Sequence, residues 1–189
     1  FAKYPSLEAF AAADISDVEE MVHSCGFYKH KARDIVLACQ MLLSDYDGKV
    51  PGTMEELLNQ VIEIQPVEFM GGAMALDLTD TSEDGKWALS YFTGLSDAAK
   101  ITDVCVYEPM MGSQAFSLVM VRTAEGQDPK AVAQEMKDNI DPRKWICVGA
   151  DEIMAAGYGD TVMFIMLDSQ LGKTAQSFVD AFAKVAGFE

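Results

Sequence analysis

The chain has 189 residues, half of them hydrophobic, which is enough for a buried core and excludes a wholly disordered protein. It carries 14 basic and 30 acidic residues, a formal charge of −16, and it is acidic both in residues 1–60 and in residues 61–189. Nucleic-acid binders gain most of their affinity by neutralising phosphates with Lys and Arg, so this charge argues against DNA as a partner. No apolar run reaches the roughly 18 residues of a membrane span.

The first sixty or so residues carry the apolar period and the capping signals of helices. Ser16 or Asp17 is the expected N-cap of the second helix, and Gly26 is the expected left-handed residue that ends it. Thr53 and Glu56 have the spacing of a capping box, which opens the fourth helix. The predicted helices span residues 6–13, 18–24, 28–46 and 53–62, with a break at Asp47-Gly48 and a turn at Val50-Pro51-Gly52.

From about Gln65 the pattern changes to short apolar runs separated by turn residues. Gly157 to Asp160 suits a tight hairpin, and Asp128-Pro129 is typical of a helix start. The predicted strands are Val104–Tyr107, Ala115–Val121, Ile153–Ala156 and Thr161–Leu167, and the predicted helices lie at Lys86–Phe92, after Asp128 and from Thr174. The order β-β-α-β-β-α predicts an α+β fold, an antiparallel sheet with helices on one face. We therefore expect two domains, a helical segment of residues 1–57 and an α+β domain of residues 58–189.

The stretch Cys25-Gly-Phe-Tyr-Lys-His-Lys-Ala-Arg-Asp-Ile35 lies in a run, residues 4–57, that is similar to the middle of endonuclease III-type DNA glycosylases. The resemblance implies that the turn before the Lys-Ala helix approaches DNA and that Phe27 wedges into the base stack. Tyr28, Lys29 and Lys31 would then lie beside the DNA. The alternative is that Phe27 and Tyr28 pack against the neighbouring helix and that the basic residues form a solvated face.

This chain departs from the family where the active site should follow. The family continues with the DNA-binding hairpin Leu-Pro-Gly-Val-Gly and then a catalytic lysine, whereas this chain reads Leu58-Asn-Gln-Val-Ile-Glu-Ile-Gln-Pro66. The family's four-cysteine cluster loop requires closely spaced thiolates. The cysteines here are widely separated, at positions 25, 39, 105 and 147. No catalytic residue and no cofactor can therefore be assigned, and the cysteines are expected to be free thiols unless the protein is exported and forms a disulfide.

Residues 57–189 resemble a family of small bacterial exported lipoproteins of unknown function. The likeness rests on Tyr91–Leu95, Val104–Met111, Phe116–Arg122 and Ile153–Met166. It implies an extracytoplasmic α+β domain that reaches the membrane only through a lipid anchor upstream of this chain.

Other candidate sites in the larger part are weak. Gly172-Lys173-Thr174 resembles a phosphate-binding loop, but position 167 is Leu where that motif needs its first glycine. Asp77, Asp80 and Glu83 fit a calcium loop only loosely, so we expect no metal site. Met110 and Met111 form either soft packing or an exposed loop that contacts an apolar partner.

The favoured hypothesis is an uncharacterised, non-enzymatic binding or interaction domain of the cell envelope that carries an inactive helical fragment. Its partner would be an unknown protein or a small ligand, with DNA disfavoured by the acidic charge. The alternative is a DNA base-excision repair protein, an endonuclease III-like glycosylase or abasic-site lyase without its catalytic hairpin in this chain. That alternative implies a cytoplasmic location.

Overall fold

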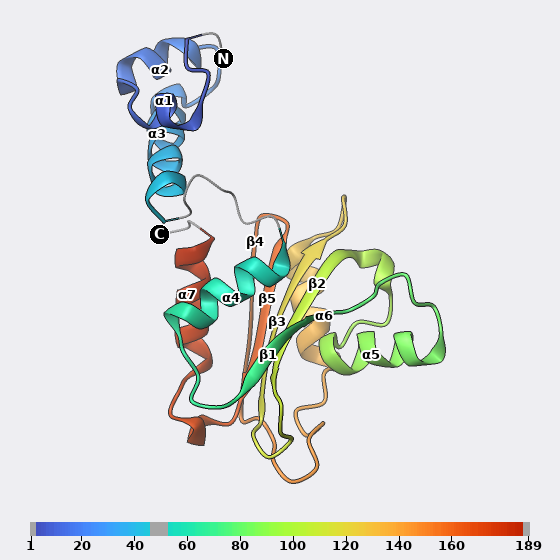
Figure 1. Ribbon diagram of the computed structural model, residues 1–189. Helices are drawn as coiled ribbons and strands as arrows, with labels where there is room; N and C mark the ends of the chain where they lie inside the picture. The colour runs from blue at the N-terminus through green and yellow to red at the C-terminus, as the bar shows by residue number, and fades with distance from the viewer. Residues whose placement is uncertain (1–2, 46–52, 187–189) are drawn as a thin grey trace. The chain divides into compact units, whose positions relative to one another are not determined.

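The computed structural model describes residues 3–45 and 53–186, and the chain divides into two compact units, Phe1–Gly52 and Thr53–Glu189 (Figure 1). The boundary expected at residue 57 lies inside helix α4 (Met54–Ile64), and four residues of this helix are buried in the second unit. The capping box at Thr53 and Glu56 is confirmed. The predicted break at Asp47-Gly48 and turn at Val50-Pro51-Gly52 lie outside the described residues.

The first unit contains the helices α1 (Leu7–Ala11), α2 (Ile15–Met21) and α3 (Tyr28–Asp45). Val18, Ala32 and Val36 form its small buried core. The N-cap of α2 is Asp14, whose Oδ1 accepts a hydrogen bond from the backbone N–H of Ser16 at 2.8 Å. The expected cap at Ser16 or Asp17 is therefore wrong, because Asp14 already satisfies the first N–H groups of the helix.

The second unit is built on an antiparallel sheet, which confirms the α+β class. Within the described residues the sheet has five strands in the order β1-β2-β3-β5-β4. Their bounds are β1 Gly71–Ala75, β2 Ile101–Pro109, β3 Phe116–Thr123, β4 Glu152–Tyr158 and β5 Thr161–Leu167. Short 3-10 turns, Ala98–Lys100 and Ser169–Leu171, precede β2 and follow β5.

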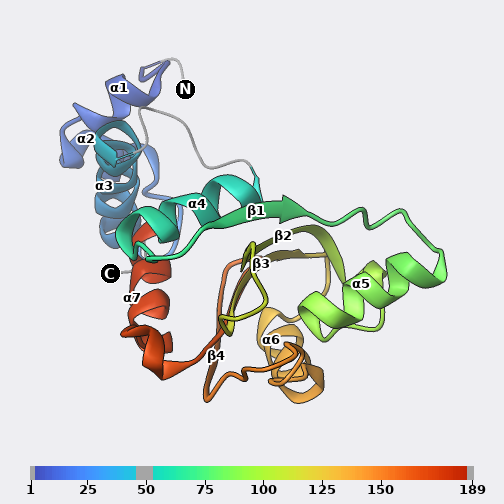
Figure 2. The same cartoon turned by 60° about the horizontal axis from the view of Figure 1, so that its bottom comes forward.

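Helices cover both faces of this sheet (Figure 2), whereas helices on one face only were expected. α4 and α7 (Ala175–Val185) pack on one face, and α5 (Glu83–Thr93) and α6 (Pro129–Asn139) lie on the other. The reason is the composition of the central strands: all residues of β5 and nearly all of β3 are buried, on either side of the sheet. Two apolar cores result, one on each face.

The edge strand β1 was not predicted, because its sequence begins with two glycines that are typical of a turn. Gly71 faces the ring of Tyr107 on β2, and a Cβ at this position would lie 2.5 Å from that ring. Glycine therefore permits the close approach of a large aromatic side chain, a role that local sequence patterns do not indicate.

Lys144 is buried beside the apolar core on the sheet face that α5 and α6 cover. The Nζ of Lys144 lies 2.6 Å from Oε1 of Glu108, and the exposed fraction of the lysine side chain is 2%. The same Nζ donates to Oγ of Ser117 and to the backbone carbonyl of Tyr91, each at 3.3 Å. Rings of Tyr91, Phe92 and Trp145 surround it at 4.7, 5.1 and 5.4 Å. Burial lowers the pKa of Lys144, and the neighbouring Glu108 carboxylate opposes that shift.

Replacing Lys144 alone is expected to destabilise the second unit strongly. The variant Lys144→Met leaves the Glu108 carboxylate without its counter-ion and should lower the free energy of unfolding by about 3 kcal/mol or more. The double variant Lys144→Met/Glu108→Leu should recover most of this loss, because it also removes the unpaired charge. Urea denaturation measures both, with exposed Lys137→Met as the control. Wild-type stability of the single variant would contradict a structural role for the pair.

Candidate nucleic-acid interface

The turn between α2 and α3 presents an aromatic side chain to solvent. Phe27, the residue before the first residue of α3, has an exposed fraction of 83% and a φ of +59°. Its backbone carbonyl accepts the N–H of Lys31 at 3.1 Å, in the first turn of α3. Gly26 was expected to adopt the left-handed conformation that ends the second helix. This expectation is wrong, because Phe27 adopts that conformation instead. A bulky side chain in this conformation costs about 1–2 kcal/mol, and such strain concentrates at functional sites.

The two aromatic residues of this turn behave differently. Tyr28 is half-buried, and its ring contacts the ring of His23 with centroids 4.6 Å apart. Phe27 does not pack against the neighbouring helix in this way. The alternative given above was that both aromatic residues pack within the protein, and it holds for Tyr28 but not for Phe27.

Basic side chains also gather at the start of α3. Lys29, His30, Lys31 and Arg33 are all exposed. Within residues 3–45 and 53–186, neither Lys29 nor Lys31 takes part in an ion pair, so both ammonium groups are available. The unpaired N–H groups at a helix N-terminus add partial positive charge and favour phosphate there. Contact of Phe27, Tyr28, Lys29 and Lys31 with DNA stays a prediction.

The buried pair of Lys144 and Glu108 does bring a lysine against a carboxylate, and neither residue was singled out from the sequence. They lie far apart along the chain and have no motif between them. With only 2% of the Lys144 side chain exposed, a substrate cannot reach its Nζ without rearrangement of the surrounding rings. This pair is part of the core.

The cysteines do not fit an iron–sulfur cluster or another metal centre. Cys25 and Cys147 are exposed, Cys39 is partly buried and Cys105 lies inside the sheet core, and all four are free thiols. In the described part of the chain, no three His, Cys, Asp or Glu residues are arranged to hold a metal ion. A four-thiolate cluster requires its cysteines close together. No step of the chemistry is therefore assigned to such a group.

Two further segments were singled out from the sequence, Met110-Met111 and Gly172-Lys173-Thr174. Met110 and Met111, in the turn between β2 and β3, have exposed fractions of 74% and 70%. Their contact with a partner stays a prediction. Gly172 ends a 3-10 turn in a left-handed conformation, and Thr174 is the N-cap of α7, so this segment is a capped helix start. Among the residues described, no helix is long and apolar enough to cross a membrane.

Comparison with known proteins points to DNA repair. The family model described as "HhH-GPD superfamily base excision DNA repair protein" matches residues 1–176. The chain is 45% identical over 58 residues to Endonuclease III of Synechocystis sp., which covers 31% of this chain and 26% of that protein. It is 40% identical over 52 residues to Endonuclease III homolog 2, chloroplastic, of Arabidopsis thaliana (28% and 14% covered). It is 33% identical over 58 residues to Endonuclease III of Bacillus subtilis (31% and 26% covered). The chain thus spans about a quarter or less of the length of these relatives. No solved structure matches it.

These matches confirm the endonuclease III-type resemblance and correct several expectations. The non-enzymatic cell-envelope domain is wrong, because the repair-family match extends far into the segment assigned to it. The expectations that the chain is not an enzyme and that DNA is disfavoured are wrong for the same reason. The likeness to exported lipoproteins, and with it the extracytoplasmic location, is not supported. The charge argument failed because net charge averages over the molecule, whereas a phosphate responds to the charges near it.

The backbone conformation of Phe27 yields a stability prediction. Glycine adopts a positive φ without steric cost, so Phe27→Gly should raise the free energy of unfolding of the helical unit by about 0.5–1 kcal/mol. Urea denaturation followed by circular dichroism measures the change. The matched control is Leu37→Gly, an exposed residue inside α3, which should be destabilising. A destabilised Phe27→Gly variant would show that the Phe27 side chain is needed for packing.

The cysteines should differ sharply in reactivity. Burial, with smaller contributions from Glu55 and Asp103, raises the pKa of the Cys105 thiol to about 11. Because the thiolate is the nucleophile, Cys105 should resist iodoacetamide at pH 8 while exposed Cys25 and Cys147 react. Peptide mass spectrometry of the folded protein measures this, and labelling in urea should equalise the sites. Rapid labelling of Cys105 in the folded chain would contradict its position in the core.

Proposed function

Because the chain belongs to the HhH-GPD superfamily of base excision DNA repair proteins, we propose that it acts on damaged DNA and contacts it through residues 25–31. The observation that carries this proposal is the exposed side chain of Phe27, held on a left-handed backbone at the start of a helix. Lys29 and Lys31, which take part in no ion pair among the described residues, follow it at the start of α3. Phe27 would serve as an apolar wedge, and the N-terminus of α3 with its two lysines would bind phosphate.

The wedge has a physical purpose in base excision. A base inside a duplex is inaccessible to a repair enzyme, so it must leave the stack before its glycosidic bond can be attacked. An apolar side chain inserted between base steps replaces part of the lost stacking and keeps the gap open. Because 83% of the Phe27 residue is exposed, its insertion between base steps gives up little contact with the described part of the protein.

The lysines supply the affinity that does not depend on base sequence. The ammonium groups of Lys29 and Lys31 and the N-terminal N–H groups of α3 can neutralise phosphates on either side of the wedge. The first unit carries 5 basic and 8 acidic residues, and the second carries 9 and 22. The excess negative charge therefore belongs mainly to the α+β unit, while the turn around Phe27 is locally basic.

The activity proposed for the whole protein is removal of a damaged base, with or without cleavage at the abasic site. That chemistry requires a nucleophile or an activated water, together with a carboxylate. Within residues 3–45, the recorded lysine–carboxylate pair is the exposed ion pair of Lys3 with Asp17, at 2.8 Å. We assign it no catalytic role, and the residues proposed here have the role of DNA contacts. Such a function requires a location where the protein meets DNA, which corresponds to the cytoplasmic alternative.

DNA binding tests the proposal directly. The full chain is titrated at low salt into a fluorescein-labelled duplex that contains one abasic site, and anisotropy measures the binding. We expect saturable binding that is tighter than for the intact duplex. Phe27→Ala should abolish that preference, since the wedge is lost. Lys29→Ala/Lys31→Ala should weaken binding to both duplexes and reduce the salt slope by roughly 1.8, about 0.9 for each phosphate contact.

Matched variants separate these effects from general changes of charge or surface. Lys130→Ala/Lys137→Ala removes two exposed lysines from α6, and Ile146→Ala removes a side chain that is 97% exposed. Both should bind like wild type. If wild type binds neither duplex, or if the two lysine pairs behave alike, the proposed interface is wrong. Release of a damaged base from the same duplexes tests the enzymatic part, and its absence with wild-type binding intact would overturn that part alone.

A further inference from the structure

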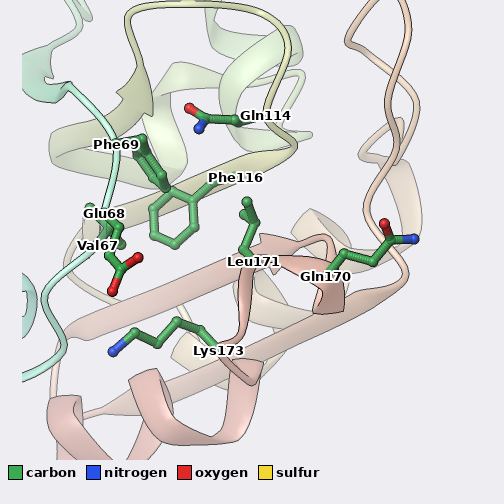
Figure 3. Close-up of a pocket in the computed structure, with 8 residues that line it drawn as sticks. All are labelled: Val67, Glu68, Phe69, Gln114, Phe116, Gln170, Leu171 and Lys173. Carbon is green, nitrogen blue, oxygen red and sulfur yellow. The ribbon is translucent and has the colours of Figure 1, made fainter.

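A small cavity lies within the α+β unit (Figure 3). Its volume is about 260 Å³. The lining comes from three separate segments, the connection from α4 to β1, the start of β3 and the turn that leads into α7. Its residues are Val67, Glu68, Phe69, Gln114, Phe116, Gln170, Leu171 and Lys173. Ligand sites of drug-sized molecules occupy roughly 300–1,000 Å³, so this cavity fits one smaller molecule.

The floor of the cavity is aromatic and firmly held. The ring of Phe116 is buried, and it meets the ring of Phe69 edge-to-face with centroids 5.2 Å apart. On its other side it packs against Phe178 of α7 at 5.3 Å. Leu171 borders the same floor (Figure 3). Such an edge-to-face pair favours a flat apolar group, because a third ring can extend the arrangement.

The polar side chains of the cavity are exposed or partly exposed and are free to contact a ligand. In the described part of the chain, the side chains of Glu68, Gln114, Gln170 and Lys173 have no hydrogen-bond or ion-pair partner. Glu68 and Lys173 lie on the same side of the Phe116 ring, whereas the amide of Gln170 points away in the other direction (Figure 3). The carboxylate and the ammonium therefore stand beside one aromatic floor without neutralising each other.

Two opposite charges beside an apolar floor define a class of ligand. A molecule that carries an ammonium and a carboxylate on one carbon can pair with Glu68 and Lys173 at once. The first N–H groups of α7 already have partners, since the N–H of Ala175 donates to Oε2 of Glu152 at 2.6 Å and that of Ser177 donates to Oγ1 of Thr174. The positive charge for the ligand carboxylate therefore comes from Lys173. A nucleotide is disfavoured, because one cation in a strongly acidic unit cannot balance several phosphate charges.

We propose that this cavity binds a small zwitterion with a flat apolar side chain, of the class of free aromatic α-amino acids. The ligand ammonium contacts Glu68, the ligand carboxylate contacts Lys173, and the ring lies against Phe69 and Phe116. This inference is independent of the proposed function in DNA repair. The cavity is built within the α+β unit, and its residues do not overlap those of the turn at Phe27.

Three related ligands test the two charge contacts separately. Calorimetric titration of the full chain with L-phenylalanine should give saturable binding with a Kd near or below about 1 mM. N-acetyl-L-phenylalanine lacks the ammonium and L-phenylalanine amide lacks the carboxylate, so each should bind about two- to five-fold more weakly, as expected for losing one exposed charge contact.

Variants of the two charged residues complete the test. Glu68→Gln should weaken L-phenylalanine and its amide but leave N-acetyl-L-phenylalanine unchanged. Lys173→Met should weaken L-phenylalanine and the N-acetyl compound but leave the amide unchanged. Glu63→Gln and Lys184→Met, exposed residues of α4 and α7 outside the cavity, are matched controls and should bind like wild type. The proposal is overturned if no saturable binding occurs up to about 10 mM, or if either cavity variant changes the affinity for all three ligands equally.

Discussion

The α+β unit is constrained by the burial of its central strands on both faces. Because β5 and most of β3 are inaccessible along their whole length, polar chemistry can occur only at the ends of the strands, at the sheet edges and in the turns. The cavity at the start of β3 follows this rule. Lys144 is the exception, and it tolerates the interior only because a carboxylate, a hydroxyl, a backbone carbonyl and three rings replace its hydration.

The helical unit follows a different principle. Its core is small: within residues 3–45, only Val18, Ala32 and Val36 are buried in it, yet the unit holds Phe27 in an unfavourable backbone conformation. A small core contributes little folding free energy, so a strained residue that served no function would be a large cost to the stability of this unit. The strained residue, Phe27, is also a large apolar residue with 83% of its surface exposed. This coincidence is why the turn, and not the better-packed remainder of the chain, is assigned to DNA.

Local signals predicted the elements well and the tertiary relations poorly. The Thr53–Glu56 capping box, the Asp128-Pro129 helix start and the strands of β3 and β5 all rest on neighbouring residues, and the structure has them. The strand β1 was missed because Gly71 is explained only by the distant ring of Tyr107. The pairing of Glu108 with Lys144, and the presence of Glu68 and Lys173 in the same cavity, depend on the fold as well. The candidate turn was found through a resemblance, whereas its left-handed Phe27 carries no pattern that distinguishes it from a glycine cap.

The positions of Trp87 and Trp145 have a practical consequence. Both tryptophans of the chain belong to the α+β unit, where Trp145 is nearly buried against Lys144 and Trp87 stacks on Tyr91 at the surface. Intrinsic indole emission therefore reports on that unit and is insensitive to the three-helix unit. An experiment that follows only this optical signal would miss complete melting of the part that carries Phe27.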